Sequence, residues 1–249
     1  MSADADLSFA HRLADAADAI TMGRFRALDL QVDTKPDLTP VSEADRTAEE
    51  KVRELVAASG RGENVLGEEL GDDGGDARWI VDPIDGTTNY VRGVPVWATL
   101  LALEREGEVA VSLVSAPALH RRWWAVRGEG AFAEGARCAV SRVPRIEDAA
   151  ISTTSARRMP DGWRELVRRA WSNRGLGDFW QHCLVAEGSL DVATDGPYMR
   201  VWDYSAVRLL VEEAGGRATT FEGEPPADRR SLVTTNGLLH DEVVSLLRG

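Results

Sequence analysis

Trp79-Ile-Val-Asp-Pro-Ile-Asp-Gly-Thr-Thr-Asn89 is the segment around which we expect the rest of the chain to be arranged. Its apolar start predicts a buried strand, which should stop at Asp82 because Pro83 cannot donate a hydrogen bond to a neighbouring strand. Residues 85–89 predict a tight turn and the first turn of a helix. Carboxylates suit hard divalent cations and helix N-termini suit phosphate, so the segment suggests a site for both. The alternative is an ordinary turn, since Asp-Pro and Asp-Gly are common turn sequences.

The composition indicates a soluble protein with a substantial core. The 249 residues are 43% hydrophobic, enough for one large domain or two modest ones that share a sheet. Acidic residues outnumber basic ones by 41 to 29, which argues against a nucleic-acid partner. The net charge of −12 suits a site that concentrates cations, although solubility alone would also explain it.

Cysteine usage and hydropathy favour a cytoplasmic location. Cys138 and Cys183 are the two cysteines, too few for a disulfide framework or a zinc site. The first residues show neither a basic nor an apolar signal pattern, and no apolar run approaches the roughly 20 residues that span a bilayer. We therefore expect a cytoplasmic protein with no membrane partner.

The first half of the chain predicts two helices followed by an antiparallel meander. Apolar residues recur at helical spacing over 4–30, and Ser42 with Asp45 resembles a capping box that opens a helix ending near Ala58. Val65-Leu66 predicts a short strand leading into Gly67-Glu68-Glu69. After the central segment, strands are predicted at 94–103, 109–114, 121–126 and 131–133.

The second half alternates strands and helices, which predicts a mixed α/β sheet. Strands are predicted at 149–153, 174–178, 186–193, 217–220 and 232–235, and helices at 161–171, 179–186, 202–214 and 238–247. Repeats, low-complexity tracts and clear linkers are absent from the sequence. We therefore expect residues 1–249 to form a single unit, with a metal- and phosphate-binding half at 1–145 and a second α/β half at 146–249.

Several acidic residues should converge on one edge of the predicted sheet. Glu68 follows one strand, Asp82 and Asp85 follow another, and Asp203 opens a helix whose dipole favours its ionised form. Carboxylates this close raise one another's pKa values unless cations lie between them. Mg²⁺ takes oxygen ligands and keeps waters or phosphate oxygens, and the Ile84 carbonyl could add a neutral ligand.

These motifs together resemble the signatures of the inositol monophosphatase family. The resemblance rests on Gly67-Glu68-Glu69, Asp82–Asn89 and Trp202-Asp203-x-x-Ala206, followed by Glu213-Ala-Gly-Gly216. Lys35-x-Asp37 and Asp45 match the family's N-terminal pattern. The resemblance covers essentially the whole chain. It implies an α/β fold, the layered αβαβα sandwich of sugar phosphatases, and a homodimer.

Further segments resemble the histidinol-phosphate phosphatases, the branch of this family that serves histidine biosynthesis. They are residues 91–97, 115–124, 177–179, 183–188 and 235–241. This resemblance implies a Mg²⁺-dependent phosphate monoester hydrolase that converts L-histidinol phosphate to L-histidinol and phosphate. An inositol-1-monophosphatase or a broader sugar or nucleotide phosphatase is the alternative with the same chemistry. A non-catalytic binding protein on this fold is a third alternative, which retention of every expected ligand disfavours.

The family resemblance also implies a metal-ligand set. The first Mg²⁺ would be bound by Glu68, Asp82 and the Ile84 carbonyl, and the second by Asp82, Asp85 and Asp203. A third, weaker ion would lie near Glu68.

The same resemblance assigns the phosphate and the attacking water. Gly86, Thr87 and Thr88 would cradle the phosphate, and Asp85 and Asp203 would also contact the substrate. Thr87 and Asp45 would orient and help deprotonate the water, with Glu68 nearby. The metal-activated water would attack in line, without a phosphoenzyme.

The choice of alcohol is expected to depend on Gly177 and Asp178, which occupy the family's alcohol-contacting segment. An anionic Asp178 would favour the cationic histidinol over neutral inositol by a charge-assisted hydrogen bond. The alternative is that Asp178 caps the helix predicted from Phe179. Glu187 and Asp195 are further acidic candidates.

Overall fold

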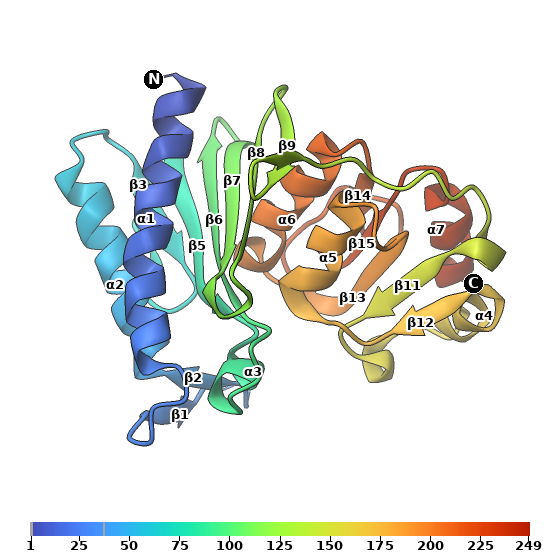
Figure 1. The fold of residues 1–249 in the computed structure, drawn as a ribbon, viewed down its shortest axis with the longest axis horizontal. Coiled ribbons are helices and arrows are strands. Elements are labelled where there is room, and N and C mark those ends of the chain that lie inside the picture. The colour runs from blue at the N-terminus through green and yellow to red at the C-terminus, as the bar shows by residue number, and fades with distance from the viewer. Residues whose placement is uncertain (1, 37) are drawn as a thin grey trace.

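The computed structural model describes residues 2–36 and 38–249 and stacks its helices and sheets in five layers (Figure 1). Two helices cover the outer face of the first sheet, two lie between the sheets, and two cover the far face of the second sheet. In that order the pairs are α1 (Ala3–Arg24) with α2 (Glu43–Ala58), α5 (Asp178–Ala186) with α6 (Val201–Glu213), and α4 (Gly162–Arg169) with α7 (His240–Arg248). The αβαβα sandwich expected from the sequence is confirmed.

The first sheet has eight strands in the order β10-β9-β8-β7-β6-β5-β3-β4. Every adjacent pair is antiparallel except β3 and β5, which run parallel. The predicted meander is therefore confirmed. The strands are β3 (Asn64–Gly67), β4 (Gly71–Asp72), β5 (Ala77–Asp85), β6 (Ala98–Arg105), β7 (Glu108–Ala116), β8 (Arg121–Val126), β9 (Gly130–Ala133) and β10 (Ala136–Arg137).

The second sheet has five strands in the order β12-β11-β13-β15-β14, with β11 parallel to both of its neighbours. They are β11 (Ala150–Thr153), β12 (Ser172–Arg174), β13 (Val192–Met199), β14 (Arg217–Thr219) and β15 (Arg230–Thr235). The hairpin of β1 (Val32–Thr34) and β2 (Pro40–Ser42) lies beside the short helix α3 (Thr87–Val91) at one end of the first sheet (Figure 1).

Four predicted strands have wrong boundaries, among them the strand predicted at 94–103, which begins at Ala98. Strand β5 continues past Pro83 to Asp85, because the register with β6 shifts between Asp82 and Asp85 and a proline is tolerated at such an irregularity. The strand predicted at 174–178 instead ends at Arg174. The one predicted at 186–193 begins at Val192 and runs on to Met199.

Successive side chains of β5 point to opposite faces of the first sheet, and this alternation determines the face on which Asp82 lies. Trp79 and Val81 pack under α1 and α2, whereas Ile80 packs in the layer between the sheets. Because side chains alternate across a strand, Asp82 follows Ile80 onto the inner face, where α6 lies. The buried strand therefore delivers a carboxylate to the junction of the two halves.

The two cysteines are free thiols in the interior. Cys138 and Cys183 are both buried and belong to the core between the sheets. None of the described helices is both long and apolar enough to cross a membrane.

Candidate active site

Three carboxylates meet where β5 ends and α6 begins. Asp82, Asp85 and Asp203 each offer an oxygen within 4.8 Å of the others. A backbone N–H fixes each carboxylate, from Ile84 at 3.0 Å, Phe179 at 2.7 Å and Arg200 at 2.7 Å respectively. The cluster is thus oriented by the backbone rather than by mobile side chains, and it joins residues from both halves of the chain.

The electrostatics of this cluster fit a divalent cation. Burial raises the pKa of Asp82 well above its usual value, and the charges of Glu68, Asp85 and Asp203 raise it further. Burial and then neighbouring carboxylates likewise raise the pKa of Asp85 and of Asp203. Crowded anions of this kind are stabilised by a cation that shares them, and an all-oxygen donor set suits Mg²⁺.

Glu68 lies near this cluster but is held by a lysine. Its backbone N–H donates to the Val81 carbonyl at 3.1 Å, which places the turn after β3 beside β5. Lys35 lies 2.6 Å from a carboxylate oxygen of both Glu68 and Glu69. Burial would lower the pKa of Lys35, but the two glutamates raise it above its usual value. Asp37, which completes the N-terminal pattern of the sequence, lies outside the described residues.

Asp45 makes both contacts that the sequence suggested for it, one in the cap of α2 and one with Thr87. One oxygen accepts hydrogen bonds from the Ser42 backbone at 2.8 Å and from the Ser42 hydroxyl at 2.5 Å, completing the predicted capping box of α2. The other oxygen lies 3.2 Å from the Thr87 hydroxyl, which also contacts the Ile84 carbonyl at 2.9 Å. Asp45 is fully buried, and burial raises its pKa.

Gly86 shapes the turn between the carboxylates and α3. Its φ of 83° lies in the left-handed region, and a Cβ there would lie 3.1 Å from the Val96 carbonyl and 3.2 Å from the Asp178 carboxylate. Glycine fits this conformation without strain. The start of α3 at Thr87 has no side-chain cap, and N–H groups at the start of a helix suit an anion.

Asp178 does not cap α5 with its side chain, so that interpretation is wrong. Asp178 is the first residue of the helix. The N-cap is Gly177, and the helix has no side-chain cap hydrogen bond. The N–H of Phe179 instead donates to Asp85, across the junction of the two halves. The Asp178 carboxylate accepts a hydrogen bond from Asn89 at 3.2 Å. Burial raises the pKa of Asp178 to about 7, with a smaller contribution from the charge of Asp195.

A cleft of about 920 Å³ opens over these groups. Its lining includes Glu68, the carboxylate cluster, the turn at 86–89, and residues 177 and 178. A smaller cavity of about 190 Å³ adjoins it and is lined in part by Asp178, His182 and Asp195. The cleft therefore brings together the predicted metal, phosphate and alcohol residues.

The remaining two acidic candidates differ in position. One oxygen of Asp195 accepts hydrogen bonds from Gln181 at 2.9 Å and lies 2.7 Å from His182 Nε2, and Asp195 lines the smaller cavity. Glu187 instead pairs with Arg121 and accepts the indole N–H of Trp123, outside the cleft lining. Glu187 is therefore a packing residue.

Sequence reasoning missed part of the cleft lining that the second half supplies. Thr154, Ser155, Arg158 and Tyr198 line both cavities, and the Arg158 guanidinium lies 5.0 Å from the centre of the Tyr198 ring. The polar pair Thr154-Ser155 directly follows β11, and polar residues after a parallel strand are a signal that could have identified this part of the site.

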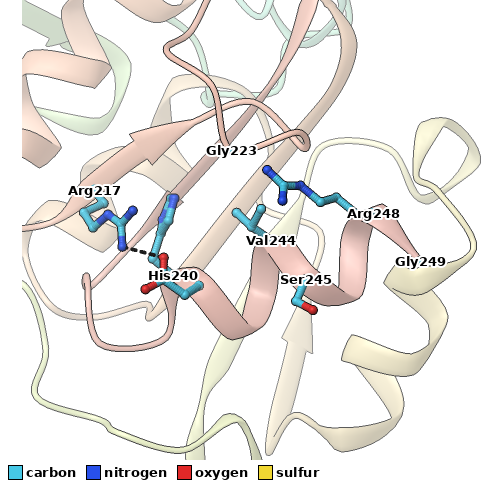
Figure 2. Close-up of a pocket in the computed structure, with 8 residues that line it drawn as sticks. Arg217, Gly223, His240, Val244, Ser245, Arg248 and Gly249 are labelled. Atoms are coloured by element: carbon cyan, nitrogen blue, oxygen red, sulfur yellow. Dashed lines mark hydrogen bonds and ion pairs between the residues drawn. The ribbon is translucent and has the colours of Figure 1, made fainter.

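A separate cavity of about 360 Å³ lies far along the chain, beside α7. It is lined by residues such as Arg217, Gly223, His240 and Arg248, which Figure 2 shows. Arg217 also forms an ion pair with Asp241 at 2.7 Å. This cavity has none of the clustered carboxylates of the cleft, so we do not take it as the active site.

The comparisons with known proteins agree with this geometry. Residues 3–249 match the family model described as the inositol monophosphatase family. The chain is 50% identical to a histidinol-phosphatase of Mycobacterium tuberculosis, covering 97% of both chains, and 49% identical to one of Streptomyces coelicolor, covering 97% and 96%. Among solved structures, a Thermotoga maritima IMPase superposes with a TM-score of 0.90 at 32% identity, covering 98% of this chain and 96% of that one. The chain belongs to the inositol monophosphatase family.

Proposed function

We propose that this protein is a Mg²⁺-dependent phosphomonoesterase that hydrolyses L-histidinol phosphate to L-histidinol and phosphate. The observation that supports it most directly is the convergence of Asp82, Asp85 and Asp203 beside the turn that opens α3. The two relatives that are about half identical along nearly their whole length bear the same activity in their names.

In this proposal the carboxylates hold two or three Mg²⁺ ions. Glu68, Asp82 and the Ile84 carbonyl would ligate one, and Asp82, Asp85 and Asp203 another, with Glu68 near a third. Bound Mg²⁺ supplies positive charge that neutralises the phosphate dianion, acidifies water and stabilises the leaving oxygen. Lys35 would give up part of its contact with Glu68 when a cation binds, because the lysine and the cation would compete for the same carboxylate.

The residues of the turn would bind the phosphate and position the water. The N–H groups of Gly86, Thr87 and Thr88 suit the phosphate oxygens. The Thr87 hydroxyl would orient the water for in-line attack, and Asp45 would take up a proton through Thr87. The raised pKa of Asp45 suits proton acceptance better than an ordinary aspartate would.

The alcohol part of the substrate would be recognised by the segment at Gly177 and Asp178. Gly177 brings the backbone close to Thr154, and Asp178 projects its carboxylate toward the turn at Gly86. Histidinol has an ammonium and an imidazole, whereas inositol is neutral. A charge-assisted hydrogen bond donated by the ammonium to the Asp178 carboxylate would favour the cation by about 1.5–3 kcal/mol.

Phosphate release from a substrate panel, with Mg²⁺ and with EDTA, tests the proposal. We expect kcat/KM to be highest for L-histidinol phosphate, well above inositol 1-phosphate and an aryl phosphate, and activity to vanish in EDTA. The second candidate is an inositol monophosphatase, which the similarity to the Thermotoga maritima structure favours. Equal or reversed kcat/KM values for the first two substrates would select it.

We also propose that the protein acts in the cytoplasm as a homodimer. The two buried free thiols suit a reducing compartment, and the family resemblance favours the dimer. Sedimentation equilibrium checks the assembly, and a mass corresponding to one chain at all concentrations would contradict it.

A further inference from the structure

A buried glutamate on α2 lies under the turn that presents Glu68. Glu49 is fully buried, although an ionised carboxylate is costly to bury unless it is paired and hydrogen-bonded. Its oxygens accept the backbone N–H groups of Glu69 at 2.7 Å and of Leu70 at 3.1 Å. These are the two residues that directly follow Glu68, so the carboxylate is fixed to the backbone of the turn itself.

The turn approaches this carboxylate so closely that only glycine fits before Glu68. A Cβ on Gly67 would lie 1.9 Å from one Glu49 oxygen and 2.2 Å from its carboxyl carbon. Contacts below 3.0 Å require something to move. The glycine is therefore needed for close packing of turn against helix, and Glu49 and Gly67 form two sides of one contact.

Arg53 completes the contact one helical turn later. Its guanidinium donates to a Glu49 oxygen at 3.0 and 2.9 Å and also contacts the Val65 carbonyl, the Gly71 carbonyl and Asp73. Val65 lies in β3 before the turn and Gly71 begins β4 after it. The pair Glu49–Arg53 thus holds the turn at its middle and at both ends.

The same face of α2 carries Asp45, which contacts Thr87. Residues four apart lie on one face of a helix, so Asp45 and Glu49 are stacked along α2. Asp45 fixes the helix to Thr87, the first residue of α3, and Glu49 fixes it to the turn that follows β3. The helix therefore sets the spacing between Thr87 and Glu68 across the cleft.

We propose that Glu49 is a positioning residue for the metal site, which it serves by holding the Glu68 turn where Glu68 can share a cation with Asp82. This inference rests on the proposed Mg²⁺-dependent function. In this proposal Glu49 contacts neither the substrate nor the metal. Its effect passes through the backbone of Glu69 and Leu70 to the side chain of Glu68.

The test compares Glu49→Gln with Glu50→Gln, a matched change at the exposed neighbouring glutamate. We expect Glu49→Gln to raise the half-saturating Mg²⁺ concentration about tenfold, as loss of partners that orient metal ligands typically does. The same shift should appear in the Mg²⁺ dependence of Tm. The KM for substrate at saturating Mg²⁺ should stay within about twofold of the wild-type value, since the substrate contacts are unchanged.

Gly67→Ala approaches the same contact from the other side and leaves the Glu49 charge in place. It should raise the half-saturating Mg²⁺ concentration as well, and the double variant should be less impaired than the product of the two single effects. A folded Glu49→Gln protein with wild-type Mg²⁺ dependence in both measurements would overturn the proposal. So would a loss of activity that is the same at every Mg²⁺ concentration.

The Tm measurement separates this inference from the proposed function. A wild-type chain that binds Mg²⁺ but releases no phosphate would overturn the proposed function, and the Mg²⁺ dependence of Tm would still decide the role of Glu49.

Discussion

Asp82 shows how a single residue can be unfavourable for the fold and necessary for the site. It is only 2% exposed and is surrounded by other carboxylates, which raise its pKa together with burial. A chain selected for stability alone would place a neutral residue at this position of β5. A buried carboxylate with a strongly raised pKa is the expected signature of a functional position.

The first prediction concerns Asp82→Asn in the absence of metal. Because the pKa values of the clustered acids are raised in the folded state, the metal-free protein should lose stability as pH rises through them. The amide removes one charge and keeps the oxygen that accepts the Ile84 N–H. We expect the free energy of unfolding of the variant to exceed that of wild type by about 1–2 kcal/mol at pH 8 in EDTA.

The same variant should lose both the Mg²⁺-induced rise in Tm and the Mg²⁺-dependent turnover. Asp76→Asn, at an exposed position of an acidic loop, is the control and should behave as wild type. Retained turnover in Asp82→Asn would refute its assignment as a ligand.

The second prediction concerns the alcohol and uses Asp178→Asn. Asn keeps a partner for the Asn89 amide and tolerates the left-handed backbone at this position, where φ is 46°. Loss of the charge should lower kcat/KM for L-histidinol phosphate about 10- to 100-fold, and leave that for an aryl phosphate within about threefold. Steady-state kinetics on both substrates measures this. A uniform loss would show that Asp178 maintains the turn instead of selecting the substrate.

At the scale of elements, the sequence predicted most helices and strands but not all of their ends. The capping box of α2 and the helix α6 followed from local residues, because caps and periodicity are local signals. The path of β5 beyond Pro83 and the start of β13 did not, because partner strands decide them. Arg158, Tyr198 and Glu49 were missed for a related reason, since their places at the site arise only when distant turns meet.

The third prediction compares two helical glycines. Gly162 opens α4, and a Cβ there would lie 1.7 Å from the Leu246 carbonyl of α7. Gly162→Ala should therefore destabilise the protein by roughly 2–3 kcal/mol, because backbone cannot yield as a side chain can. Gly23→Ala in the last turn of α1 meets nothing within 4 Å and should stabilise it by up to about 0.5 kcal/mol. Urea unfolding measures both, and effects of the same sign would contradict the packing argument.

At the scale of the whole molecule, α5 and α6 tie the halves together. One hydrophobic cluster includes Ile80 and Leu100 of the first sheet, Leu210 of α6, and Ala193 and Leu232 of the second sheet. The fourth prediction is that the chain unfolds in one transition, because neither sheet can keep its inner face covered alone. Equal calorimetric and van't Hoff enthalpies would support this, and two resolved transitions would show independent halves.

The fifth prediction concerns acid stability and the buried His240 of the cavity in Figure 2. Burial lowers the pKa of His240 to about 4, with Arg217 contributing, and its nitrogens contact Thr235 and Thr219. A histidine with a lowered folded-state pKa stabilises the fold above its unfolded pKa of about 6.5, and this stability is lost as pH falls toward 4. The contribution is at most about 3 kcal/mol, and less after solvent screening.

Comparing His240→Asn with wild type between pH 7 and 4 isolates that effect from the many titrating acids. The variant should show a shallower loss of stability over this range. His120→Asn, at an exposed position, should keep the wild-type slope. Identical slopes for all three proteins would show that His240 does not couple to pH.

The hydrogen bond from the Phe179 N–H to Asp85 has a consequence for the synthesis of this protein on the ribosome. During translation the first sheet and its two carboxylates leave the ribosome well before α5 and α6 are made. Until those helices dock, Asp85 lacks its backbone donor and Asp203 is absent from the cluster. We therefore expect a nascent or truncated chain that lacks residue 203 to be catalytically silent.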